Sequence, residues 1–597
     1  MKVTITKTKN HKFVYIQKDV YLRDVRGKKS DKNPSGKERT TVTVEKLGKM
    51  EDLMASMQLT EEEVIAWAKA RARELTEAEK KDQEKITVDY YPNLLIDKDA
   101  ERVFGCGYLF LQQLCSDLRM DNICRNIGNR HRYEFNLEEI LRDQTYARIL
   151  DPGSKESSYK FCRSLLEPPK YAQHEIYRAL SVLAEESDYI QEEVFRNSRL
   201  VMKRNSKVLY YDCTNYYFEI EQSDDFRKYG KSKEHRPSPI VQMGLLLDGS
   251  GLPVAFDLFP GNKNEQPSMK PLEQKVIQNF DLEKFVICTD AGLGSEANRR
   301  FNHIRNRAFI VTQSIKKLKQ EEQEYIFRNT GWKNLSDGKD ADMEKVLEEP
   351  ELFLNEIFYK DMPYDGSKVK DQRMIATFSP RYCLYQKKVR DGQIERAVKM
   401  IQDKRKKNER GNPNDPARFV KKIPVTDEGE VAEQVLFSLD QDAIDSEAKY
   451  DGYYAVCTDL LDDPAEDILK VSEGRWEIEE SFRIMKTDFR ARPVYLSREE
   501  RIKAHFLICY LALLIYRLLE KKLECRYTVS QIISALRSMK LLAVEGIGYQ
   551  PAYRRTDLTD ALHGLFGFHT DYQIMKKSSI RSIISQTKTP ERPKKEH

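Results

Sequence analysis

The chain has 597 residues, which at roughly 100–200 residues per domain predicts several domains and excludes a single small module. Hydrophobic residues make up 40% and charged residues 33% of the sequence, a composition that excludes a disordered chain and a protein made mainly of membrane spans. The net charge is only +5, but basic residues are concentrated at 1–50 (14 Lys and Arg against 5 Asp and Glu), 399–422 (9 against 3) and 576–597 (7 against 2). Such blocks are typical either of solvated surfaces or of a protein that contacts a polyanion at several places.

Residues 1–95 are predicted to form a basic, strand-rich module on a helical stalk. Alternating residues over about the first 50 positions predict strands, and a helical pattern follows from Met50 to Lys85. We expect this module to bind DNA. Because the first ten residues carry charges where a signal peptide has its apolar segment, we also expect an intracellular protein.

Residues 96–205 predict a helical domain, and the pattern changes at Lys207. Three β-rich runs follow, KVLYYDCTNYYFEIE, PIVQMGLLLD and LPVAFDLFPG, and then a helical pattern at 266–280 and the strand KFVICTDAG. A short helix N-capped by Ser295 and a fifth strand, AFIVTQSI, complete this region. This order of elements predicts an α/β core whose first part spans residues 206–316.

Residues 317–449 interrupt this pattern with charged, mixed segments and are predicted to be an insertion domain. The core resumes over 450–525 with a strand at GYYAVCTDL and one long helix from about Pro464 to Phe489. The apolar stretch 504–519 falls short of the ~18–20 uncharged residues that cross a bilayer, so it predicts a buried helix and no membrane contact. Residues 526–597 are predicted to be partly helical and to end in a basic tail.

The ten cysteines do not form a metal-binding pattern. The sequence contains no C-x-x-C and no Cys and His cluster at zinc-ligand spacing. We therefore predict reduced thiols that are mostly buried.

Two aspartates occupy unusual places in the predicted core strands. Asp212 follows the apolar run Val208–Tyr211, and Asp290 follows the strand 285–289. An ionised carboxylate in such a place costs several kcal/mol unless a partner or a metal compensates it. A single aspartate at a strand end usually caps the next turn, but two on strands that an α/β arrangement places side by side favour a shared site.

The predicted helix VSEGRWEIEESFRIMKTDFRARP supplies a third carboxylate. Arg475 interrupts its apolar stripe, Glu479 follows four residues later, and Lys486 follows seven after that, so all three are expected on one side of the helix. A solvated ion-pair ladder is the simplest interpretation. The alternative is a cleft in which three carboxylates hold two divalent ions for phosphodiester chemistry, with Mg²⁺ or Mn²⁺ preferred because the ligands are oxygens.

These segments together resemble an insertion-sequence transposase of the DDE superfamily. The similar motifs are DCTNYYFE with Asp212, TDAGLGSEANRR with Asp290, and RWEIEESFRIMK with Glu479. The final helix matches an IS-four-like branch whose signature is Tyr, two residues, Arg, three residues, Glu, six residues, Lys. Arg475, Glu479 and Lys486 fit this spacing, whereas Ser472 occupies the Tyr position.

The resemblance implies an RNase H-like mixed-sheet catalytic core interrupted by the insertion domain. It further implies that Asp212, Asp290 and Glu479 are catalytic and hold two Mg²⁺ or Mn²⁺ ions, while Arg475 and Lys486 hold terminal phosphates. Lys233 and Arg236, in the similar motif GKSKEHRP, are weaker candidates for contact with the DNA backbone. The implied partners are double-stranded DNA, both terminal inverted repeats and target, and a second copy in a homodimer. The implied location is the bacterial cytoplasm, with nucleoid association when DNA is bound.

Three alternatives stay open. Trp332, the single tryptophan of the insertion, either packs in the interior or stacks on a splayed base of the DNA. A structure-specific nuclease on the same fold would share the hydrolytic step but not the joining step. A non-catalytic DNA-binding derivative of a transposase is less consistent with three intact carboxylates.

Overall fold

The computed structural model describes residues 1–8, 11–26, 37–83, 86–234, 236–280, 282–304, 306–366, 368–402, 414–425 and 434–591. The chain divides into two compact units, Met1–Ala100 and Glu101–His597. The predicted basic blocks lie partly outside the described residues.

The first unit is an antiparallel sheet packed on two helices. Its strands β1 (Lys2–Lys7), β2 (Lys12–Arg26) and β3 (Lys37–Lys49) pair in this order, and α1 (Met50–Met57) and α2 (Glu61–Gln83) follow. Val14, Met50, Val64 and Ala68 form its buried centre. The predicted strands and the helical segment after them are confirmed.

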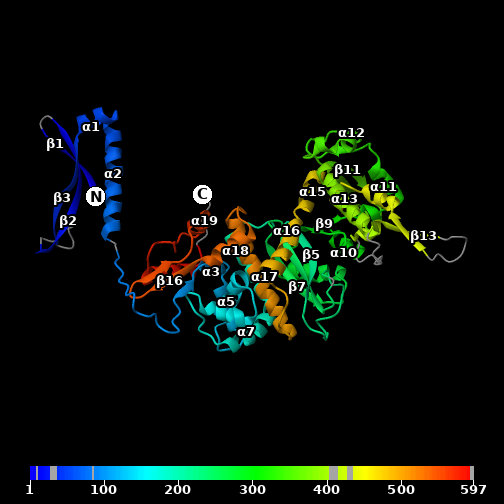
Figure 1. Cartoon of the computed structure of the whole chain (residues 1–597), viewed down its shortest axis with the longest axis horizontal. Coiled ribbons are helices and arrows are strands. Elements are labelled where there is room, and N and C mark those ends of the chain that lie inside the picture. Colours follow the sequence, from blue (N-terminus) through cyan, green and yellow to red (C-terminus); the bar gives the residue numbers. More distant parts are fainter. Residues whose placement is uncertain are drawn as a thin grey trace. The chain divides into compact units, whose positions relative to one another are not determined.

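The second unit begins with a helical layer around one central apolar helix. The layer contains β4 (Val103–Gly105), α3 (Tyr108–Asp117), α4 (Met120–Gly128), α5 (Leu137–Leu150), α6 (Lys155–Arg163), α7 (Gln173–Glu185) and α8 (Ser187–Val201). The central helix α17 (Glu499–Lys522) contacts α3, α5 and α7 on one side and strand β7 (Pro253–Pro260) on the other (Figure 1). The helix is long and apolar enough to cross a membrane, so the prediction that this segment falls short of that length is wrong. Its apolar window is nevertheless 94% buried inside the protein, which confirms the predicted buried helix.

The second part of this unit is a mixed sheet of nine strands. Its centre has the order β9-β8-β5-β6-β7, formed by β5 (Val208–Tyr217), β6 (Ile240–Asp248), β7, β8 (Phe285–Thr289) and β9 (Arg307–Thr312). Strands β5, β6 and β7 pair antiparallel, whereas β8 runs parallel to both β5 and β9. Helices α9 (Met269–Asn279) and α10 (Glu296–Asn302) connect β7 to β8 and β8 to β9. This strand order confirms the predicted RNase H-like core.

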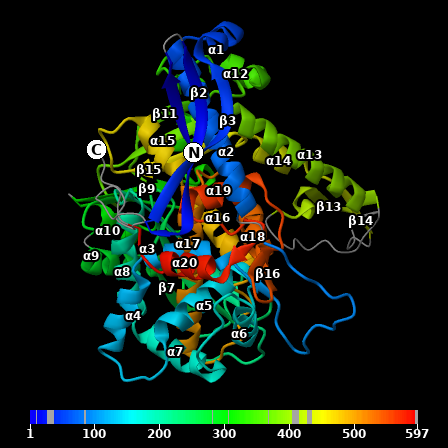
Figure 2. The ribbon, with the colours of Figure 1, turned by 90° about the vertical axis from the view of Figure 1, so that its left-hand side faces the viewer.

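The segment between β9 and the returning strand β15 (Tyr453–Thr458) extends this sheet. Strands β10 (Lys333–Asn334), β11 (Phe358–Pro363) and β12 (Arg373–Phe378) add antiparallel to β15 at one edge. The rest consists of α11 (Gln320–Phe327), α12 (Met343–Glu348), α13 (Pro380–Gln402), α14 (Gln441–Ala448) and the hairpin β13 (Val420–Val425) and β14 (Gln434–Leu439). Figure 2 shows this hairpin at the end of α13 that lies away from the sheet.

The C-terminal residues return to the helical layer. They form α18 (Val529–Ser538), β16 (Lys540–Val544), β17 (Gly548–Pro551), α19 (Asp557–Phe566), β18 (Met575–Lys576) and α20 (Lys577–Thr587). Strand β16 pairs with β4, so the two ends of the second unit share one small sheet. The ten cysteines are free thiols, of which only Cys383 and Cys525 are not buried, as predicted.

The prediction of one helix from about Pro464 to Phe489 is wrong. The segment is divided into α15 (Ala465–Glu473), α16 (Trp476–Arg483) and the π-helical turn η5 (Ile484–Asp488). The first break is at Gly474, where a Cβ atom would lie 2.1 Å from the Tyr210 hydroxyl oxygen. Glycine permits this close approach to β5 but weakens the helix.

Candidate active site

Asp212 and Asp290 occupy equivalent positions on two neighbouring parallel strands. The last pair in the register of β5 and β8 is Tyr210 with Cys288. Asp212 follows two residues later within β5, and Asp290 follows two residues later, directly after the end of β8. Because strand side chains alternate with a period of two, the two carboxylates lie on the same face of the sheet. The prediction that the fold brings these aspartates side by side is confirmed.

The carboxylate of Asp212 lies in an environment that opposes its charge. Burial raises its pKa to about 6, and the nearby Asp290 acts in the same direction, while Lys233 and Arg475 act against it. Asp212 Oδ1 accepts a hydrogen bond from the Cys213 backbone N–H at 2.7 Å. Asp290 Oδ1 accepts one from the Leu293 N–H at 3.0 Å, which holds this carboxylate at the start of the turn after β8.

The helix α16 carries three glutamates, and their contacts distinguish them. Glu477 forms ion pairs with Arg517 and Lys521 of α17, and Glu480 pairs with Arg483. Glu479 pairs instead with Arg475: its side chain is 58% exposed, and its Oε1 is 3.1 Å from Nη2 of Arg475. Glu477 therefore joins two helices of the core, whereas Glu479 is the glutamate left accessible to a substrate or an ion.

Arg475 connects Glu479 to the aspartates. It directly follows Gly474, at the point where the helix approaches Tyr210 of β5. Its guanidinium lowers the pKa values of both Asp212 and the Cys288 thiol of β8, although burial, which raises them, is the larger influence. The break in the helix thus places the Arg475–Glu479 pair at the end of the two parallel strands.

Two lysines approach the same strand from other elements. Lys486, in η5, donates a hydrogen bond to Thr214 Oγ1 at 2.6 Å and lies 3.9 Å from Glu234. Burial lowers its pKa, with Arg492 and Lys233 contributing. Lys233 donates to the Cys213 carbonyl oxygen and lies 3.3 Å from Glu265. Burial opposes its charge, but Asp212 and Glu265 hold the pKa of Lys233 above its ordinary value.

The structure separates the two other DNA-contact candidates. Arg236 is half exposed, and its guanidinium lies 4.3 Å from the centre of the Tyr217 ring. Trp332 is only 1% exposed, and its indole N–H donates to the Arg328 carbonyl oxygen at 2.9 Å. The prediction that Trp332 stacks on DNA is wrong because the ring packs beside Tyr453 in the core of the insertion.

The donor set at the strand ends fits hard divalent cations. Asp212 is buried with a raised pKa even though Lys233 and Arg475 lie near enough to lower it. Two aligned carboxylates in such a partly desolvated place are oxygen ligands of the kind that Mg²⁺ or Mn²⁺ prefers. Among the described residues, the oxygens of Asp212, Asp290 and Glu479 do not all lie within 4.8 Å of one another, because Glu479 is paired with Arg475. The arrangement is therefore a preformed aspartate pair with a third carboxylate beside it.

Several residues of the site were not singled out in the sequence, although Thr214 lies in the motif DCTNYYFE and Glu234 lies in GKSKEHRP. Thr214, Glu234 and Glu265 hold the two lysines. Ser472 is 3.1 Å from the Tyr454 hydroxyl, which also contacts Thr312. A tyrosine from β15 therefore places its hydroxyl beside the serine of the signature helix, a relationship that only the sheet topology reveals.

Comparisons with known proteins find similarity to transposases. The family model described as transposase DDE domain matches residues 207–515. No curated protein sequence matches the chain. Among solved structures, a piggyBac transposase synaptic complex with hairpin DNA is similar over 81% of this chain and 85% of that chain, with 9% identity and a TM-score of 0.33. A Drosophila P element transposase strand transfer complex is similar over 80% of this chain and 98% of that chain, with 12% identity and a TM-score of 0.20.

Proposed function

This chain belongs to the DDE family of DNA transposases, and we propose that it cuts the ends of its own insertion element and joins them to target DNA with Mg²⁺ or Mn²⁺. The observation that carries this proposal is the placement of Asp212 and Asp290 at equivalent positions on parallel strands, beside Glu479. We propose that these three residues hold two ions. When bound, the ions would supply positive charge to the scissile phosphate and lower the pKa of water.

The other side chains of the site bind and orient the DNA. Arg475 offers a planar guanidinium to a phosphate oxygen, and Lys486 and Lys233, which contact neighbouring residues of β5, act as point charges. Glu234 and Glu265 orient these two lysines. The joining step requires the freed 3′-hydroxyl to be held in line with a target phosphate. The three cations Arg475, Lys486 and Lys233 are suited to holding two phosphates close together.

A strand-cleavage and joining assay tests the proposal. The substrate is a labelled duplex that carries the terminal repeat of the element, together with a supercoiled target plasmid and Mg²⁺. We expect the wild-type protein to release 3′-hydroxyl ends and to join them. Asp212→Ala, Asp290→Ala and Glu479→Gln should lose both steps but keep DNA binding, because these groups contact ions rather than the duplex. Glu480→Gln is the matched control and should retain activity, since Glu480 contacts Arg483 on the same helix.

The outcomes separate the alternatives. Cleavage without joining would indicate a nuclease on the same fold, and binding with neither step would indicate a non-catalytic derivative. Near-normal cleavage by any carboxylate variant would remove that residue from the site. We further propose that the DNA complex is a homodimer with one active site for each element end, and light scattering of the assembled complex measures this.

A further inference from the structure

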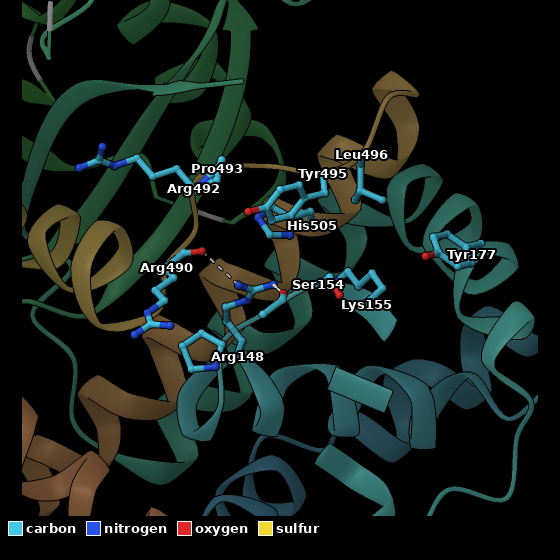
Figure 3. A pocket seen from close by; sticks show the side chains of 12 residues that line it. Arg148, Ser154, Lys155, Tyr177, Arg490, Arg492, Pro493, Tyr495, Leu496 and His505 are labelled. Carbon is cyan, nitrogen blue, oxygen red and sulfur yellow. Dashed lines mark hydrogen bonds between the residues drawn. The ribbon is translucent and has the colours of Figure 1, made fainter. Parts of the chain in front are cut away.

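A pocket lined by basic side chains lies in the second unit. It has a volume of about 420 Å³ and is lined by the end of α5, the loop to α6, residues 490–496 and α17. Arg148, Lys155, Arg490 and Arg492 contribute to its lining, and none of its described lining residues is acidic. Figure 3 shows Arg148 and Lys155 on one side of the pocket, with Tyr495 and His505 across from them.

Lys155 is the central observation. The residue is 5% exposed, and its Nζ has no hydrogen-bond partner within the described part of the protein. The two acidic residues nearest in sequence do not neutralise it: Asp151 is exposed to solvent, and Glu156 pairs with Lys160 at 2.7 Å. A buried ammonium without an acceptor is unfavourable, so this side chain lacks the anion that its environment requires.

Arg148 adds a second uncompensated charge. Its guanidinium donates to three backbone carbonyl oxygens, those of Gly153, Phe489 and Arg490, at 3.1 to 3.3 Å (Figure 3). These contacts fix the orientation of the guanidinium without cancelling its charge, and its Nε is buried and unpartnered among the described residues. Burial, and after it the charge of Arg148, lowers the pKa of Lys155 to about 7, so an anion bound in the pocket would stabilise the charged form of this lysine.

The N-terminus of α6 adds to the positive potential of the pocket. Ser154 is its N-cap and accepts a hydrogen bond from the Ser157 N–H at 3.1 Å, and Lys155 is the first helical residue. The positive end of a nine-residue helix therefore faces the same pocket. Two cations and a helix N-terminus around one cavity are the chemistry that recognises phosphate.

We propose that this pocket binds a phosphate group of the DNA, with the attached nucleotide against Tyr495. Tyr495 is 71% exposed at the pocket, so its ring is available to a sugar or base. The volume exceeds that of a phosphate alone and leaves room for part of a nucleotide. The proposal deepens the proposed function, on which it rests for the identity of the ligand.

The position of the pocket relative to the carboxylates supports this choice of ligand. Arg492, at its edge, pairs with Glu234, and Glu234 is 3.9 Å from Lys486, which in turn donates to Thr214 of β5. Charged groups thus continue from the pocket to the strand that carries Asp212. We infer that the bound phosphate lies on the same DNA as the scissile phosphate, a few nucleotides away.

Binding measurements in EDTA test the pocket independently of catalysis. The probe is a fluorescein-labelled 20-bp duplex of arbitrary sequence, prepared with and without 5′-phosphates, and the readout is anisotropy over a range of salt concentrations. Lys155→Met should weaken binding about tenfold and reduce the salt slope by about one unit. Lys339→Met is the matched control, because it removes one exposed charge elsewhere, and it should change neither quantity.

A second measurement separates DNA from free anions. At constant ionic strength, inorganic phosphate should raise the thermal unfolding midpoint of the wild-type protein relative to chloride, and it should not do so for Lys155→Met. Loss of affinity for both duplexes would identify a backbone phosphate, and loss for the phosphorylated duplex alone would identify a terminal one. Unchanged affinity and salt slope for Lys155→Met would overturn the proposal, even if inorganic phosphate stabilises the protein. Absence of strand cleavage by the wild-type protein would refute the proposed function without affecting this test.

Discussion

Asp212 and Asp290 follow the last paired residues of two adjacent parallel strands by the same two positions. The sheet therefore fixes the backbone positions from which the two carboxylates extend, with Asp212 inside β5 and Asp290 at the first position after β8. Strands are more rigid than loops, so a site built on them holds its ligands more accurately. The cost is the burial of a charged group, which raises the pKa of Asp212, with the nearby Asp290 adding to this effect. This cost leads to the first two predictions.

Asp212→Asn should stabilise the protein in the absence of divalent metal. The pKa of Asp212 is raised from 3.8 to about 6, chiefly by burial. The folded state therefore favours the protonated carboxyl, and stability is lost as the pH rises from about 4 through about 6. Above that window, the neutral amide should be more stable by about 1 to 3 kcal/mol, since one pKa unit corresponds to about 1.4 kcal/mol.

Urea unfolding in EDTA at pH 5 and pH 8 measures this difference. The stability gain of Asp212→Asn should be larger at pH 8 than at pH 5. An equal or smaller gain at pH 8 would show that Asp212 is not desolvated as the structure indicates.

A divalent metal ion should stabilise the protein more at high pH than at low pH. An ion requires the ionised carboxylate, so protons compete with it below about pH 6, near the pKa of Asp212. The increase in thermal unfolding midpoint caused by Mn²⁺ should be small at pH 5 and should grow as the pH is raised to 7.5. Asp212→Asn should remove most of this increase at every pH. A pH-independent increase that survives in the variant would place the ion elsewhere.

The sequence predicted the aspartate pair because both residues end apolar runs, and such runs identify core strands with little ambiguity. It could not predict the break at Gly474, because the break depends on the Tyr210 hydroxyl, which is 264 positions earlier in the sequence. The spacing of Arg475, Glu479 and Lys486 predicted one side of a single continuous helix, whereas the structure has Arg475 and Glu479 at the start of α16 and Lys486 in η5. Lys155 shows the same limit: in the sequence it is an ordinary lysine after an N-cap, and only the packing of 490–496 and α17 over it makes it buried.

Glu477 and Glu479 should respond differently to loss of charge. Glu477 pairs with the buried Arg517 and with Lys521. Glu477→Gln removes one acidic partner of Arg517, which keeps Glu520 at 2.6 Å, and should lower the free energy of unfolding by about 1 to 3 kcal/mol. Glu479→Gln should change stability by less than about 1 kcal/mol, since its pair with Arg475 is largely exposed. Chemical denaturation of both variants checks this contrast. A large loss for Glu479→Gln would indicate a structural role.

Trp332→Ala should act through stability alone. The ring is buried beside Tyr453, with the Lys360 ammonium 5.1 Å from its centre. Removing it creates a cavity and should cost about 3 to 5 kcal/mol, while Trp332→Phe should cost less. End processing at a temperature where the variants remain folded should match that of the wild type. A specific loss of processing by folded Trp332→Phe would restore a role in DNA contact.

Arg475→Leu and Lys486→Met should fold and lose function. Arg475 pairs with Glu479 and acts on Asp212, whereas the partly buried Lys486 has a pKa lowered by burial. Neither charge is required by the core, so unfolding free energies should stay within about 1 kcal/mol of the wild type. Under the proposed function, each variant removes a phosphate contact beside the carboxylates. Strand cleavage or joining should then fall sharply, and Lys486→Met should also bind less tightly to cleaved ends that carry a terminal phosphate. Normal joining by both folded variants would show that the two cations serve only the local ion pairs.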